Sequence, residues 1–105
     1  MIEYAVDEPI GNLIRQLRHR QGLTQSSLAD LLADASGNDG VNRRQVARWE
    51  RGKRIPSPYW REWIGVTLDV PADRLARAAA LARFLRAAPD VAEGLAHRPR
   101  ATISG

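Results

Sequence analysis

Apolar side chains near the start of the chain repeat with the period of a helix. They recur at spacings of three, four and seven residues, at Ile10, Leu13, Ile14 and Leu17. This spacing places them on one face of an amphipathic helix. Asp7, Glu8 and Pro9 suit the first turn of that helix, and Gly22 suits its end. We therefore expect a first helix that ends just before Gly22.

A second helix is predicted to follow directly. Thr24 is a plausible cap for its amino terminus. Its apolar positions are Leu28, Leu31 and Leu32. The stretch ASGNDG, residues 35–40, then places Asn and Asp between two glycines, a composition that breaks helices. A turn is expected there.

The next segment, VNRRQVARWERGKR at residues 41–54, combines apolar residues with six cations. In a helix, a step of about 100° per residue separates the two kinds. Val46 and Trp49 fall on one side, and the other side holds Ala47 together with Arg43, Arg44, Arg48 and Arg51. Neighbouring arginines on one face repel each other by a few tenths of a kcal/mol per pair, a cost that an external anion can offset. Asn42 can cap this helix, and Gly52 can close it in the left-handed conformation.

Two further helices complete the pattern. Ser57 can cap the fourth, with Pro58 at its first position. We expect the aromatic residues of this region to pack in the core: Trp49, Tyr59, Trp60 and Trp63. The fifth helix is predicted over residues 71–88, with an apolar stripe made by Leu75, Ala78, Ala79, Ala82 and Leu85 and widened by Leu81 and Phe84. The predicted fold is all-α, a compact bundle of about five helices.

The predicted organisation is one domain, as the length of 105 residues allows. An amino-terminal arm covers residues 1–9, and the domain covers residues 10–88. A polar tail broken by glycine and proline covers residues 89–105, and we expect it to be flexible.

Composition narrows the choice of function. The chain has 16 Lys and Arg against 12 Asp and Glu, a net charge of +4, which fits a polyanionic partner without requiring one. The absence of cysteine excludes disulfides and thiolate metal sites. His19 and His97 have no other metal-ligating residues at the spacing of a metal site, so we expect no metal and no cofactor. No serine is accompanied by the histidine and aspartate of a catalytic triad, so we expect no enzymatic activity. No apolar run approaches membrane-spanning length, and the acidic start lacks signal-peptide features, so a cytoplasmic protein is expected.

Two segments together resemble a known family. LRHRQGLTQSSLADLL followed by VNRRQVARWERGKRIP is similar to the helix-turn-helix proteins of the phage lambda repressor and Cro type, also called the Xre group. The matching features are G-L-T-Q at the start of the second helix, L-A in its middle, and V-x-x-x-x-V-x-x-W-E-x-G-K through the third. The resemblance spans about residues 10–75. It implies a double-stranded DNA-binding regulator of transcription with a recognition helix at about residues 42–51.

The resemblance also assigns roles by position. It implies base contacts from Asn42, Arg43, Arg44, Gln45 and Arg48. It implies phosphate contacts from Thr24, Gln25, Arg51, Lys53 and Arg54. Arginine binds guanine O6 and N7 with two hydrogen bonds, so we expect half-sites that contain guanine. In this family the glutamate that matches Glu50 pairs with an arginine of the first helix, and Arg18 occupies the position of that arginine.

One segment departs from the family pattern. ADASGNDG, residues 33–40, lengthens a turn that normally has only a few residues. Because it is polar, we expect it to loop out without disturbing the two helices. It could instead tilt the recognition helix, or contact the sugar-phosphate backbone through Asn38.

The sequence leaves several alternatives open for the oligomeric state, the partner and the function. The second half of the fifth helix exceeds what one domain can bury, which favours a homodimer and a palindromic DNA site. The same helix or the tail could instead bind a protein partner, as in the antitoxin of a toxin–antitoxin pair. The chain could also be a helical protein-interaction module whose basic face is only solvated.

Overall fold

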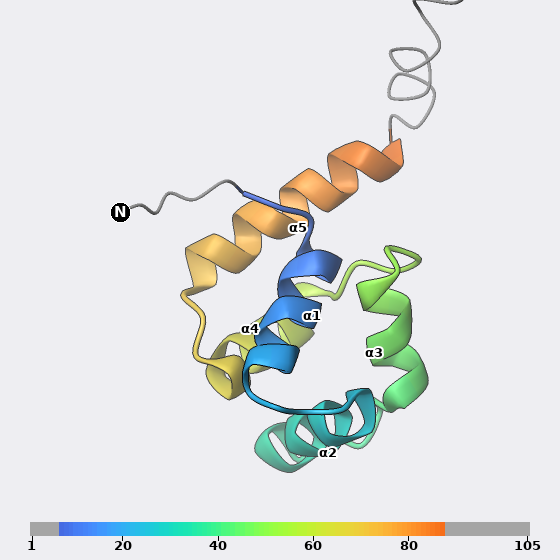
Figure 1. Ribbon diagram of the computed structural model, residues 1–105, viewed down its shortest axis with the longest axis vertical. Coiled ribbons are helices and arrows are strands. Elements are labelled where there is room, and N and C mark those ends of the chain that lie inside the picture. Colours follow the sequence, from blue (N-terminus) through green and yellow to red (C-terminus); the bar gives the residue numbers. More distant parts are fainter. Residues whose placement is uncertain (1–6, 88–105) are drawn as a thin grey trace, which may run out of the picture.

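The computed structural model describes residues 7–87 of the chain. This part contains five helices and no strand: α1 (Ile10–Arg20), α2 (Gln25–Ser36), α3 (Arg43–Glu50), α4 (Pro58–Leu68) and α5 (Ala72–Ala87). The prediction of an all-α bundle is therefore confirmed for the described residues (Figure 1). The predicted tail, 89–105, and most of the predicted arm, 1–9, lie outside them.

Short-range hydrogen bonds start three of the helices at the predicted residues. The side chain of Thr24 accepts a hydrogen bond from the Ser27 N–H at 2.9 Å. Asn42 accepts one from Gln45 at 3.0 Å, and Ser57 accepts one from Trp60 at 3.4 Å. Each cap satisfies an N–H group that would otherwise lack a partner, which contributes about 1 kcal/mol.

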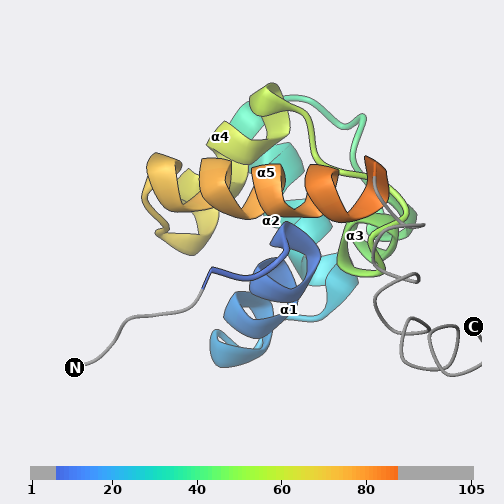
Figure 2. The same ribbon diagram turned by 90° about the horizontal axis from the view of Figure 1, so that it is seen from above.

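The core lies between the five helices, and each helix contributes buried side chains to it. α1 packs against α3 and α5, α2 packs against α3 and α4, and α4 packs against α5. The largest fully buried side chains include Ile10, Leu13, Ile14, Leu28, Leu32, Val46, Trp49, Ile64, Leu68 and Leu75. Burying one such side chain contributes about 1.5–3 kcal/mol. Figure 2 shows α5 lying across the bundle, with its carboxyl-terminal end on the side of α3.

Gly11 allows α1 and α3 to approach each other closely. A Cβ atom at this position would lie 2.3 Å from the main-chain oxygen of Trp49 and 2.9 Å from that of Glu50. Glycine costs about 1 kcal/mol relative to alanine in a helix interior. Here the absence of a side chain lets the backbone of α1 rest on the carboxyl-terminal end of α3.

The lengthened segment between the second and third helices does not simply loop out as expected. Residues 33–36 continue α2, and the turn begins only at Gly37, which has a φ of 69°. No helix breaker precedes Gly37, and the Ser36 hydroxyl donates to the Leu32 carbonyl at 2.7 Å, within the last turn. In the turn, Asn38 accepts a hydrogen bond from Gly40 N–H at 2.8 Å and donates to the Tyr59 hydroxyl at 3.3 Å. Most of the extra length is therefore ordered against the domain.

Three side chains lie elsewhere than the pattern predicts. Leu31 is 41% exposed because it lies roughly 100° around α2 from the centre of the buried face. Tyr59 is 45% exposed because it sits at the start of α4 and covers Trp60 edge-on, with ring centroids 5.0 Å apart. Ala47, expected on the exposed side of α3, is only 9% exposed. It shares a flank with Glu50, one turn further on, and that flank faces the interior.

Candidate nucleic-acid interface

The two sides of α3 differ sharply in charge and burial. Val46 is 0% exposed and Trp49 is 2% exposed, so both anchor the helix in the core. Arg43, Arg44 and Arg48 are exposed. Such a helix can bind a polyanion through its cationic outer side while its apolar inner side stays packed in the core.

The turn after α3 extends the cationic surface. Gly52 adopts a φ of 76°, which turns the chain back over the end of the helix. The N–H groups of Lys53 and Arg54 then both donate to the Arg48 carbonyl, at 2.9 and 3.3 Å. With the backbone folded in this way, the side chains of Arg51, Lys53 and Arg54 remain exposed.

Four cationic side chains surround one hollow on this surface. The hollow has a volume of about 530 Å³, and its lining consists of Arg48, Arg51, Lys53 and Arg54. No carboxylate belongs to this lining. Guanidinium and ammonium groups that converge without an acidic neighbour form a suitable site for a phosphate group, because each can donate a charge-assisted hydrogen bond.

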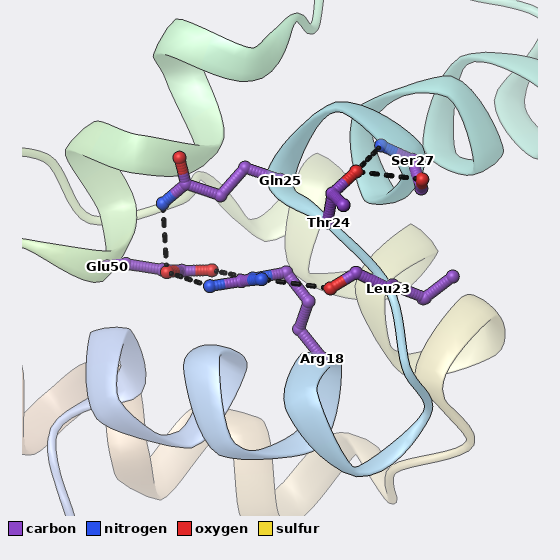
Figure 3. Close-up of polar contacts among 6 residues, drawn as sticks. All are labelled: Arg18, Leu23, Thr24, Gln25, Ser27 and Glu50. Carbon is purple, nitrogen blue, oxygen red and sulfur yellow. Dashed lines mark hydrogen bonds and ion pairs between the residues drawn. The ribbon is translucent and has the colours of Figure 1, made fainter.

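Glu50, the one acidic residue of α3, is turned into the interior (Figure 3). Its carboxylate accepts hydrogen bonds from Arg18 Nε at 2.6 Å and Arg18 Nη2 at 2.9 Å, the ion pair expected from the sequence. The Arg18 and Glu50 side chains are only 9% and 4% exposed. The hydrogen bond to Glu50 raises the pKa of Arg18 above its usual value.

The same carboxylate joins three helices. Gln25, at the start of α2, donates from its side-chain amide to Glu50 Oε1 at 3.0 Å. Arg18 Nη1 donates to the Leu23 carbonyl at 2.9 Å, just before α2 (Figure 3). This network fixes the carboxyl end of α3 against α1 and the amino end of α2. It also removes the negative charge of Glu50 from the outer surface.

The predicted contact residues occupy two kinds of position. Eight of them are exposed: Thr24, Asn42, Arg43, Arg44, Arg48, Arg51, Lys53 and Arg54. Gln25 and Gln45 are half-buried. Gln25 is bonded to Glu50, and Gln45 lines a separate hollow with Trp49 and Trp60. The hollow after α3 thus brings together four of the predicted cations, whereas the side-chain amide of Gln25 turns inward to Glu50.

Two residues of this region were not predicted from the sequence. Gly11 controls the approach of α1 to α3, and Arg86 of α5 donates to the main chain of the turn after α3. A glycine inside an amphipathic helix is a weak signal of close packing. Nothing in the sequence pattern singles out Arg86 among the other arginines.

Within residues 7–87, no three side chains of the metal-binding types gather closely enough to hold an ion. Across the same range, every helix is too short or too polar to cross a membrane.

A cationic helix over an apolar anchor, preceded by a second helix and a turn, is the arrangement found in helix-turn-helix DNA-binding domains. Comparison with protein families agrees, since residues 14–59 match the family model described as Helix-turn-helix. Over these residues the chain is similar to the DNA-binding helix-turn-helix domains of the Xre, or lambda repressor-like, group. No curated protein and no solved structure matches the chain.

Proposed function

We propose that the chain is a sequence-specific regulator of transcription that places α3 in the major groove of double-stranded DNA. The observation that carries this proposal is the arrangement of α3: Val46 and Trp49 inside, arginines outside, and the only carboxylate buried and paired with Arg18. A major groove about 12 Å wide accepts such a helix, and the residues near its amino terminus reach the base edges.

In this proposal the exposed residues divide between two roles. Asn42, Arg43, Arg44 and Arg48 contact bases, and Gln45 is a less exposed candidate for the same role. The side-chain oxygen of Asn42 already caps α3, so its amide N–H groups remain as donors. Arginine selects guanine, which predicts half-sites that contain guanine.

The phosphate contacts come from the two ends of the motif. Arg51, Lys53 and Arg54 hold the backbone at the hollow after α3, which fixes position without reading sequence. Thr24 and Gln25 lie at the start of α2, where free main-chain N–H groups favour a phosphate. For Gln25 the main chain is the better donor, because its side-chain amide is bonded to Glu50.

We further propose that the regulator is a homodimer formed through α5. Phe84 and Leu85 are 60% and 42% exposed, whereas Leu75 and Ala79 in the first half of the helix are buried. Two copies would place their recognition helices about 34 Å apart and bind a palindromic site. The same exposed residues also suit a protein partner, as an antitoxin would require. A regulator of this kind acts without chemistry in the cytoplasm of a bacterium, on the bacterial genome or on that of a phage.

Selection of bound sites from a random duplex library tests this function directly. We expect recovered sites with guanine in each half-site, and affinity that falls steeply with salt as counterions are released. Arg44→Ala should relax the base preference at one position, at a cost of about 1–3 kcal/mol for the preferred base. Lys53→Ala should weaken binding to all duplexes about equally and lower the salt slope by about 1.

The control variant for Arg44→Ala carries its substitution on α5. Arg74→Ala removes a cation near the start of α5, on the side of the molecule away from α3 (Figure 1), and should leave the base preference intact. If Arg44→Ala lowers affinity uniformly with the base preference unchanged, Arg44 does not read a base. If the chain does not bind duplex DNA at moderate salt, it is a protein-interaction module and the proposal is wrong.

A further inference from the structure

Arg86, near the carboxyl end of α5, contacts the turn that follows α3. Its Nη1 atom donates to the Gly52 carbonyl at 2.9 Å and also to the Lys53 carbonyl. These partners are separated from Arg86 by 34 and 33 residues in the sequence. The contact therefore joins the last helix to the segment that carries Lys53 and Arg54.

The turn is held from two sides. Its N–H groups, from Lys53 and Arg54, bind the Arg48 carbonyl at the end of α3. Its carbonyl groups, from Gly52 and Lys53, bind Arg86. Glycine at position 52 permits the left-handed backbone but adds conformational freedom when the turn is not fixed. Arg86 restricts the turn on the side that α3 does not reach.

We propose that Arg86 is a positioning residue for DNA binding. It fixes the turn after α3, so that Lys53 and Arg54 are presented around the cationic hollow before a phosphate arrives. An ordered donor loses less conformational entropy on binding, which raises affinity without a new contact. This inference rests on the proposed function, since it assigns a role to Arg86 in that same DNA-binding surface.

The proposal also links two parts of the molecule. Arg86 follows Phe84 and Leu85, the exposed residues through which α5 is proposed to contact a second copy. A contact that orders this end of α5 also orders the turn after α3. By thermodynamic linkage, DNA bound to the turn then favours the same contact on α5.

The test compares Arg86→Met with Arg83→Met. Both substitutions remove one positive charge from an exposed position of α5 and keep an unbranched stem, but only the first removes the bonds to Gly52 and Lys53. We expect Arg86→Met to weaken binding to every duplex by roughly 3- to 10-fold with base preference unchanged, and Arg83→Met by less than about 2-fold. Thermal unfolding of both variants should match the parent chain.

A double-mutant cycle separates positioning from simple charge. If Arg86 acts through Lys53 and Arg54, the effect of Arg86→Met should largely disappear in a chain that already carries Lys53→Ala and Arg54→Ala. Arg86→Lys, which keeps the charge but replaces the planar guanidinium, should recover only part of the affinity. Equal effects of Arg86→Met and Arg83→Met, or an undiminished effect in the Lys53→Ala, Arg54→Ala background, would overturn the proposal.

A measurement without DNA distinguishes failure of this inference from failure of the proposed function. Amide hydrogen exchange at Lys53 and Arg54 should become several-fold faster in Arg86→Met and stay unchanged in Arg83→Met. Unchanged exchange in Arg86→Met refutes positioning even if the parent chain binds DNA. If exchange is faster in Arg86→Met but the parent chain binds no duplex, Arg86 does fix the turn after α3, and its role in DNA binding is refuted.

Discussion

Glu50 brings a full negative charge into a region that is otherwise apolar or cationic. The effective cost of removing each ion of a pair from water is several kcal/mol, so the arrangement is stable only when the hydrogen bonds are nearly complete. Here two bonds from Arg18 and one from Gln25 satisfy the carboxylate. Arg18 also donates from Nη1 to the Leu23 carbonyl. The network thus joins α1, α2 and α3 at the base of the cationic surface formed by α3 and the turn after it.

Glu50→Gln should destabilise the domain by about 3–5 kcal/mol, because the neutral amide leaves the buried guanidinium of Arg18 without a counter-charge. The measurement is the free energy of unfolding from urea denaturation. Glu62→Gln is the matched control, since Glu62 is exposed on α4 and the same chemical change there should shift stability by no more than about 0.5 kcal/mol. Equal stability of the two variants would mean that the ion pair does not support the fold.

At the scale of the helices, the position of α3 depends on how closely α1 can approach it. Gly11 lies where the α1 backbone meets the main-chain oxygens of Trp49 and Glu50. These oxygens belong to the last turn of α3, directly before the segment that carries Arg51 and Lys53. The crossing of α1 and α3 therefore sets the direction in which the cationic turn projects.

Gly11→Ala distinguishes local from tertiary control of stability. Helix propensity alone predicts a gain of about 1 kcal/mol. An alanine Cβ at this position would collide with the main-chain oxygen of Trp49, which predicts a loss instead, because the backbone of α3 must shift, at a cost of about 1–3 kcal/mol. We expect a lower melting temperature and weaker DNA binding, whereas Asn12→Ala, at the exposed neighbouring position, should change neither by much. A more stable Gly11→Ala variant would contradict the close approach.

At the scale of the whole molecule, α5 has two halves with different surroundings. Its first half is buried against α1 and α4 through Leu75, Ala78 and Ala79. Its second half exposes Phe84 and Leu85 and holds the turn after α3 through Arg86. One helix therefore closes the core, exposes an apolar surface and contacts the cationic turn after α3.

Phe84→Ser should weaken self-association of the chain at least roughly tenfold, because the apolar area of a phenyl ring would no longer be buried in the dimer. Sedimentation equilibrium measures this directly. Val66→Ser is the control, since Val66 is 65% exposed on α4, outside the proposed contact. If both variants associate like the parent chain, the α5 face is not the dimer contact, and a protein partner becomes the better proposal for it.

Much of the fold could be predicted from the sequence, because the decisive interactions are short in range. Caps at Thr24, Asn42 and Ser57 act over three residues, and the left-handed Gly52 acts within one turn. The separation of the arginines of α3 from Val46 and Trp49 follows from helical period alone. The Arg18–Glu50 pair could be anticipated only through the family resemblance, because the two residues are 32 positions apart.

The sequence by itself thus determined where α2, α3 and α4 begin and which side of α3 carries its arginines, although α1 begins at Ile10, after the Asp7, Glu8 and Pro9 expected in its first turn. Only the tertiary structure decided that Gln25 turns inward to Glu50 and that Arg86 reaches the turn after α3. Hydrogen bonds within a turn depend on residues that are neighbours in the chain. The other contacts depend on the angles and distances at which whole helices cross, and those are set by the packing of the entire core.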